Sequence, residues 1–435
     1  MFKALPVALA VSAAMASMSA LAETNVELLE KRIQELENRL GSTQIEELQD
    51  DVAEEELKEA SDFEVVFTGY ARYGAAFRDG QEKFVTTAGA LNGNATGRLG
   101  NEGNGGEFQI ATKRTSASGA QWDLVLMLDE WSNMEDVVVR KMYAGVSNIF
   151  ASQPNLYLWA GRNFNQRPMS DLSDYYWMTH DGQGAGMQNF ELGGTKFDLA
   201  VVEDVEDGSR FAVTAKLHGI ELGGTNLSLY ANYGFSDKDR TVGHTAYNNF
   251  LNYNRSSTAY QLAAELSFSG QRLVARYSEN AVNSAFDLAS GHNALLFSFE
   301  GGLPVTESLG LQYLAAYQTL DVDVDNTEAK LSRDNYNAIV RPTYAWNDIH
   351  STWLEMGYNV VDYKDLNASN KSWKVTLSQN IAINAFSTGA RPMIRFYATA
   401  GKADNEFTGF DSVANEFISA NPDTVTFGAM FEAWW

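Results

Sequence analysis

The sequence predicts an all-β protein, an antiparallel β-barrel that crosses a membrane. Three observations predict it: an N-terminal export signal, alternation of apolar and polar residues from residue 63 to residue 435, and long polar gaps between the alternating segments. Beyond the export signal, no apolar stretch is long enough for a transmembrane helix, so only a closed barrel can span a bilayer.

Residues 1–22 have the composition of a cleaved secretory signal peptide. A lysine at position 3 precedes a run rich in Ala, Val, Leu and Met, and Ala-Leu-Ala stands just before Glu23. A membrane anchor would need about twenty apolar residues, whereas this run is shorter and contains serines. We therefore expect an exported chain, and because the sequence has no cysteine, one without disulfides.

Residues 23–60 differ from everything after them because their apolar residues follow a heptad pattern. Spacings of three and four separate Val26, Leu29, Ile33, Leu36 and Leu40. This is the a/d seam of a coiled coil, although its register slips near residue 41. We interpret the segment as a short oligomeric coiled coil, and the alternative is a single amphipathic helix that lies on its own barrel.

From Phe63 onward the period of the pattern is two. In residues 63–77 one phase is apolar, while the other includes Glu64, Thr68, Tyr70 and Arg72. In residues 121–131, Trp122, Leu124, Leu126 and Leu128 alternate with Asp123, Asp129 and Trp131. A strand sends alternate side chains to opposite faces, so each segment has one apolar and one polar face.

A soluble β-sandwich would also alternate, but three features favour a barrel in an outer membrane, whose domain we place at residues 61–435. These are export, aromatic residues at the strand ends, and long Gly/Asn/Asp-rich gaps such as residues 79–104 and 237–254. In the last strand Trp435 falls in the apolar phase, as an aromatic girdle requires. Trp434 shares the polar phase with Glu432.

The charge and the residue types exclude several classes of partner. A net charge of −24, from 56 acidic and 32 basic residues, argues against nucleic acid. No metal-ligand spacing or phosphate loop is evident, so we expect no cofactor beyond a weakly held calcium ion in an acidic loop such as residues 321–326.

Several stretches, in their order and approximate spacing, resemble the maltoporin family of carbohydrate-specific porins. They are FTGYARYG, GRLGNEG, LWAGRNFNQRP, SDYYW, RPMIRFYATAG and FGAMFEAWW, and they extend from residue 67 to residue 435. The N-terminal extension is similar to that of the sucrose and aryl-β-glucoside porins of this family. The resemblance implies an eighteen-stranded homotrimeric barrel in the lipid of a Gram-negative outer membrane, with the extension in the periplasm.

The resemblance also implies a sugar path in which an inward-folded loop narrows the pore. Aromatic rings give the C–H face of a sugar an apolar platform, and charged groups replace the water lost by its hydroxyls. The expected platform residues are Tyr70, Trp131, Tyr176 and Trp434. The expected polar track and constriction consist of Arg72, Arg98, Glu107, Arg140, Arg167 and Asp174.

Some of these assignments leave alternatives open. Tyr175 takes the place of Tyr176 if the alignment slips by one residue. The match of Glu107 includes a one-residue deletion before it. The arginines taken singly would also suit any wide polar lumen. Trp131 resembles the tryptophan that reaches into a neighbouring subunit's pore.

The chain departs from the family at two platform positions. Gly105 or Gly106 stands where the family has a tyrosine, and Gly389 stands where it has a tryptophan, for which Phe386 is the candidate substitute. A shortened aromatic path favours a mono- or disaccharide, or a glycoside with its own apolar group, over long maltodextrins.

The resulting interpretation is a sugar-selective channel and not an enzyme. The first alternative is a general diffusion porin, which shares every feature except the aromatic path. A second is an outer-membrane lipase, but the five histidines lie in no recognisable nucleophile motif. A third is an adhesin or envelope tether that acts through its coiled coil, which deletion of residues 23–60 would test.

Overall fold

The computed structural model describes residues 31, 63–131, 137–236, 244–245, 252–253, 256, 258–323, 331–411 and 416–435. The predicted signal peptide and coiled coil lie outside these residues, apart from residue 31. The chain divides into the units Met1–Phe63 and Glu64–Trp435. Within the described ranges, no helix is long and apolar enough to span a membrane.

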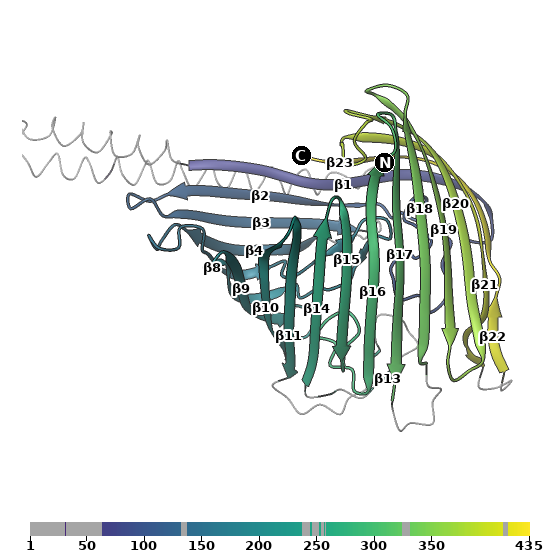
Figure 1. Ribbon diagram of the computed structural model, residues 1–435, viewed down its shortest axis with the longest axis horizontal. Helices are drawn as coiled ribbons and strands as arrows, with labels where there is room; N and C mark the ends of the chain where they lie inside the picture. The colour runs from purple at the N-terminus through teal and green to yellow at the C-terminus, as the bar shows by residue number, and fades with distance from the viewer. Residues whose placement is uncertain are drawn as a thin grey trace, which may run out of the picture. The chain divides into compact units, whose positions relative to one another are not determined.

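The strands form a closed antiparallel barrel (Figure 1). Nineteen strands share one sheet. The short β22 (Glu416–Ala420) pairs with the end of β21, and the other eighteen strands form the wall of the barrel. The long strands are β1 (Phe63–Gly80), β2 (Gly105–Thr115), β3 (Gln121–Trp131), β4 (Val138–Ser147), β5 (Tyr157–Asn163), β8 (Gly182–Leu192), β9 (Thr195–Asp204), β10 (Arg210–Leu222), β11 (Thr225–Ser236), β14 (Thr258–Phe268), β15 (Gln271–Glu279), β16 (His292–Pro304), β17 (Leu309–Val322), β18 (Arg333–Ala345), β19 (His350–Tyr363), β20 (Ala368–Ala382), β21 (Met393–Asp411) and β23 (Asp423–Trp434).

The barrel closes where its first and last strands meet. β1 pairs with β23 in a register that runs from Tyr70 opposite Trp434 to Gly80 opposite Thr424, and Figure 1 shows the two strands side by side. Gly69 and Trp435 add two backbone hydrogen bonds of 3.1 and 3.2 Å beyond that register. No strand edge is left open at this seam, as a membrane-spanning sheet requires.

Alternation along each strand places polar side chains inside the barrel and apolar side chains outside. In β20 the buried positions include Lys374 and Thr376, whereas Trp373 and Leu377 on the other face are exposed. This is the reverse of a soluble sheet, because the outer face meets lipid and the inner face meets a polar lumen. The expectation of an antiparallel transmembrane barrel is confirmed.

The two ends of the barrel differ in their connections. At one end several turns are very short, such as Gly193-Gly194, whose φ angles of 55° and 94° suit a two-residue hairpin. At the other end two long connections, residues 81–104 and 164–181, fold into the barrel. The second contains the pair β6 (Met169–Ser170) and β7 (Tyr175–Tyr176), and a further pair is formed by β12 (His244–Thr245) and β13 (Asn252–Tyr253).

The first inward segment, residues 81–104, is fixed to the inner wall by hydrogen bonds. The Leu91 amide donates to Asn335 Oδ1 at 2.6 Å, and Lys374 Nζ donates to the Leu99 carbonyl at 2.6 Å. Buried backbone groups require such partners, and the polar inner wall supplies them. The resemblance implied one inward loop, whereas the described residues include two, and this wall satisfies the backbone of the additional one.

The second inward segment, residues 164–181, packs against the first. The Asn94 amide donates to the Ser173 carbonyl at 2.7 Å, and the Arg98 amide donates to the Leu172 carbonyl at 2.9 Å. Arg276 on β15 donates to the Trp177 carbonyl. The two segments together narrow the lumen and bring loop residues against the residues of β1 and β23.

Candidate functional site

Three of the expected platform residues lie in a row inside the barrel. The ring centroid of Tyr70 on β1 is 6.0 Å from that of Trp131 on β3 and 6.3 Å from that of Trp434 on β23. The interplanar angles are 29° and 28°, so the rings are roughly parallel and offset. We call these three residues the aromatic row, and they form a continuous apolar strip on a polar wall.

Trp131 occupies space that a neighbouring glycine leaves open. β2 pairs with β3 with Gly105 opposite Trp131, and a Cβ atom on Gly105 would lie 2.4 Å from Trp131 Cε3. The first position at which the sequence lacks a family aromatic is therefore filled by Trp131. Its ring stacks on Tyr70 of its own chain, and the expectation that Trp131 serves a neighbouring subunit's pore stays a prediction.

The second missing platform is not restored by Phe386. This side chain is 54% exposed, and none of the ring contacts among the described residues includes it. Arg391, from the same connection between β20 and β21, instead places its guanidinium 4.7 Å from the ring centroid of Trp434. A cation over the indole takes the place of another ring there.

The two C-terminal tryptophans lie on opposite faces of β23. Trp434 belongs to the aromatic row, whereas Trp435 contacts Phe67 and Phe108 with centroid distances of 5.7 and 5.8 Å. Phe67 is among the exposed residues of the outer face. Trp435 therefore belongs to the apolar exterior.

A buried carboxylate lies at the end of the aromatic row. Glu432 is 1% exposed and accepts a hydrogen bond from Tyr70 Oη at 2.9 Å. Three guanidinium groups surround it at 2.7, 2.7 and 3.1 Å, those of Arg98, Arg391 and Arg395. Each contact is a charge-assisted hydrogen bond in a site with little water.

A second carboxylate, Glu102, completes this arrangement. It lies 2.7 Å from Arg395 and 3.6 Å from Arg98, so the two acids and three arginines form what we call the Glu432 cluster. Burial acts to raise the pKa of Glu102, but Arg395 and Arg98 outweigh it and lower that pKa. Arg98 is thus a buried member of this cluster, and its assignment to the polar track stays a prediction.

Of this cluster, sequence reasoning named only Arg98 as a site residue. Glu102, Arg391 and Arg395 occur in the motifs GRLGNEG and RPMIRFYATAG, and Glu432 was identified only by its strand phase. A usable signal was the spacing of four residues between Arg98 and Glu102, which suits an ion pair in a compact loop.

Arg72 connects the aromatic row to the second inward segment. Its Nη2 lies 2.8 Å from Asp174 Oδ2, and its guanidinium lies 5.2 Å from the centroid of Trp131. Asp174 has a φ of 51°, in the left-handed region that Asp tolerates better than most residues. The structure thus brings these two expected constriction residues into contact.

Arg167 organises a second group from the expected site. Its guanidinium lies 4.2 Å from the ring centroid of Tyr176, and its Nη1 is 3.6 Å from Glu107. Tyr175 is buried, with its hydroxyl donating to Asn283 Oδ1 at 2.6 Å, so it packs against the wall. Of these two tyrosines, Tyr176 is the one whose ring contacts the Arg167 guanidinium.

Arg140 lies apart from both groups. Its Nε donates to Asp129 Oδ2 on the adjacent strand at 2.5 Å. Among the described residues, it pairs with this carboxylate and contacts neither the aromatic row nor the Glu432 cluster. The pair gives the lumen one further partly exposed guanidinium.

The calcium site that the sequence suggests falls partly outside the described residues. Within the part of the chain that the structure describes, no group of three or more His, Asp or Glu side chains is placed to hold a metal ion. Of the acidic loop 321–326, residues 321–323 are described and the remainder lie outside the described ranges.

His180 should make stability depend on pH. Burial and then the charge of Arg276 lower its pKa to about 3, and its Nε2 accepts a hydrogen bond from the Ala285 amide at 3.0 Å. The pKa of a histidine in an unfolded chain is about 6.5. Between pH 6.5 and pH 3, therefore, the unfolded chain binds a proton at this residue and the folded chain does not. We expect the free energy of unfolding to fall by about 2 kcal/mol from pH 6.5 to pH 5.

Urea unfolding at pH 7 and pH 5 measures this effect. In His180→Gln the loss of stability between the two pH values should shrink, because the titrating group is gone. His350→Gln, which removes an exposed imidazole, is the control and should behave as the wild type does. Equal pH dependence in wild type and His180→Gln would contradict the assignment.

Comparison with known proteins adds a family match. The LamB porin family model matches residues 65–435. Among solved structures, OmpT of Vibrio cholerae has 12% identity and a TM-score of 0.43, with 86% of this chain and 99% of that chain covered. The anion-selective porin from Comamonas acidovorans has 10% identity and a TM-score of 0.45, with 85% and 99% covered. Pseudomonas aeruginosa OccK3 (OpdO) has 11% identity and a TM-score of 0.46, with 87% and 98% covered.

Proposed function

We propose, from the premise that this chain belongs to the LamB porin family, that small saccharides pass through its barrel by facilitated diffusion along the aromatic row. Family and fold indicate an outer-membrane channel rather than an enzyme. The sugar selectivity of that channel is our inference from the lumen.

The observation that carries the proposal is the juxtaposition of three roughly parallel rings with charged groups. The row of Trp131, Tyr70 and Trp434 offers apolar surface to the C–H face of a sugar ring. Arg72 and Arg391 lie over the two ends of that row, where guanidinium groups can donate to hydroxyls. Charged groups would line the lumen of a general diffusion porin as well, but such a channel does not require a row of aligned aromatic rings.

The length of the row favours a short guest. Three rings in sequence can contact one or two sugar units, and the lack of a fourth ring near Gly389 ends the strip at Trp434. A long maltodextrin would leave most of its units without a platform. A mono- or disaccharide, or a glycoside whose own apolar group packs on an indole, matches the row better.

Assembly as a homotrimer and a periplasmic location of the N-terminal extension belong to the same proposal. The family match over residues 65–435 supports the homotrimer, and the periplasmic location rests on the resemblance of the extension to those of the sucrose and aryl-β-glucoside porins. The heptad pattern of the extension indicates association of chains but does not by itself set their number.

Ion conductance through the purified protein in a planar bilayer tests the proposal. Maltose, sucrose and an aryl-β-glucoside are titrated separately, with sorbitol as a polyol control that lacks a sugar ring. We expect saturable block by at least one saccharide, with a dissociation constant on the order of millimolar, because a transport site must release its guest. Conductance indifferent to all three saccharides would favour the general diffusion porin.

A further inference from the structure

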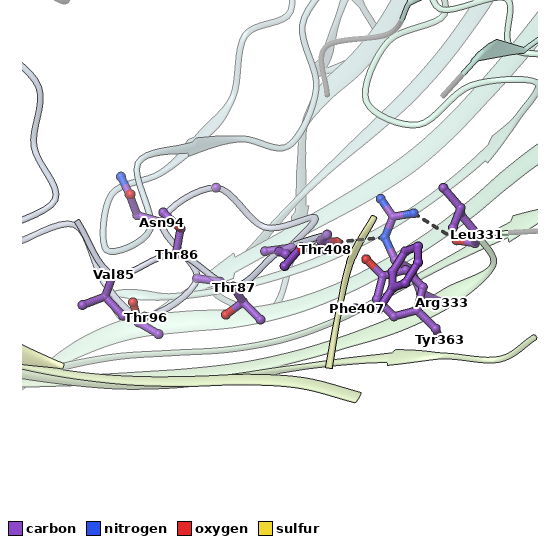
Figure 2. A pocket seen from close by; sticks show the side chains of 15 residues that line it. Val85, Thr86, Thr87, Asn94, Thr96, Leu331, Arg333, Tyr363, Phe407 and Thr408 are labelled. Atoms are coloured by element: carbon purple, nitrogen blue, oxygen red, sulfur yellow. Dashed lines mark hydrogen bonds between the residues drawn. The ribbon is translucent and has the colours of Figure 1, made fainter. Parts of the chain in front are cut away.

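A cavity of about 350 Å³ lies between the first inward segment and the wall, apart from the residues of the aromatic row (Figure 2). One end is lined by Arg333, Tyr363 and Phe407, and the other by Asn94 and Thr96. Arg333 begins β18 and Tyr363 ends β19, so the cavity is at the end of the barrel with the long connections. Its volume is in the usual range of small-molecule sites.

Arg333 is a buried cation without a counter-charge. It is 4% exposed, and its Nε and Nη1 donate to the carbonyls of Gly89 and Leu331 at 2.8 and 3.0 Å. Its Nη2 makes no hydrogen bond, and the guanidinium makes no ion pair, with any residue in the described ranges. Figure 2 shows the guanidinium with one nitrogen free of dashed lines.

Among the described residues, five of the six other buried guanidinium groups lie against carboxylates, and the sixth, Arg276, donates to the Trp177 carbonyl. Arg341 lies 2.5 Å from Glu355, and Arg391 lies 2.7 Å from Glu432. A buried charge that lacks a partner is strongly unfavourable, and two carbonyl dipoles offset only part of that cost. An anion that entered the cavity would supply the missing charge.

The walls of the cavity indicate what else the ligand must carry. The ring centroids of Tyr363 and Phe407 are 5.0 Å apart, and the Arg333 guanidinium lies 5.9 Å from the Tyr363 centroid. These rings offer apolar surface next to the charge. At the opposite end, the side chains of Asn94 and Thr96 make no hydrogen bond with described residues and can bind hydroxyls.

We propose that this cavity, the Arg333 pocket, binds a small organic oxyanion: a carboxylate or phosphate on a body of about monosaccharide size. The oxyanion accepts from Arg333 Nη2, the body packs on Tyr363, and hydroxyl groups reach Asn94 and Thr96. In a chain of net charge −24, such a site would concentrate anions at the mouth of the barrel that the surface otherwise repels. The proposal does not depend on the sugar path.

Isothermal titration of the purified full-length protein tests it with three probes: glucuronate, glucose 6-phosphate and glucose. We expect at least one anionic probe to bind more than tenfold tighter than glucose. Arg333→Gln should weaken that binding about tenfold to a hundredfold, as loss of a charged hydrogen bond does. Arg78→Gln, which removes an exposed guanidinium from β1, is the control and should bind as the wild type does.

Two further variants separate binding in the pocket from binding elsewhere on the barrel. Thr86→Phe fills the cavity without changing Arg333 and should also abolish anion binding. Trp434→Ala weakens sugar binding at the aromatic row but lies outside the pocket, so the preference for the anion over glucose should persist in this variant. Equal affinity for glucose and both anions, or anion binding that survives in Arg333→Gln, would mean that Arg333 only holds two backbone carbonyls. Tighter binding of glucuronate would indicate a carboxylate ligand, and tighter binding of glucose 6-phosphate would indicate a phosphate ligand.

Discussion

Trp434→Ala is expected to raise the disaccharide concentration that half-blocks the channel about tenfold. Trp434 is 45% exposed and stacks at 6.3 Å on Tyr70, so its indole presents open apolar surface in line with a second ring. An aromatic contact of this kind contributes about 1.4 kcal/mol, which corresponds to the tenfold change. Current block in a planar bilayer, titrated with sucrose or maltose, measures it.

The neighbouring residue offers a matched control. Trp435→Ala removes the same side chain one position further along, but from the outer face, where it contacts Phe67 and Phe108. We expect normal sugar block in this variant and a lower stability of the barrel. If both substitutions weakened block equally, or if Trp434→Ala left it unchanged, the aromatic row would not be the sugar path.

The two-residue period of the sequence predicts most of the strands and the faces of their side chains, but it predicts little of how the site residues are arranged. Because alternation decides on which face a side chain lies, residues 121–131 were correctly predicted as a strand with Trp122 and Leu124 on the outer face. The same argument assigned Trp434 and Trp435 to opposite faces, where the structure also places them.

Strand phase does not give the height of a residue along the barrel or the path of a loop. Trp131 meets Gly105 only through the register of β3 against β2, which no local pattern shows. The first inward segment, residues 81–104, escaped prediction for a similar reason. Its stability comes from wall residues such as Asn335 and Lys374, more than two hundred residues away in the sequence.

Glu432→Ala is expected to destabilise the barrel by about 3–5 kcal/mol. The substitution leaves Arg98, Arg391 and Arg395 close together with only Glu102 to balance them, and removal of one partner from a buried ion pair has an effect of this size. Urea unfolding of the barrel folded into lipid vesicles measures the change. Folded and unfolded fractions can be separated by their mobility in unheated gels.

Asp423→Ala, which removes an exposed carboxylate from the same strand, is the matched control and should change the free energy of unfolding by less than about 0.5 kcal/mol. Because Glu432 also accepts the hydrogen bond of Tyr70, its loss should free that ring and weaken sugar block along with stability. Normal stability in Glu432→Ala would mean that water already screens the three guanidinium groups. The Glu432 cluster would then be an open polar lining of the lumen, as the sequence alone suggests, and not the support that holds the aromatic row in place.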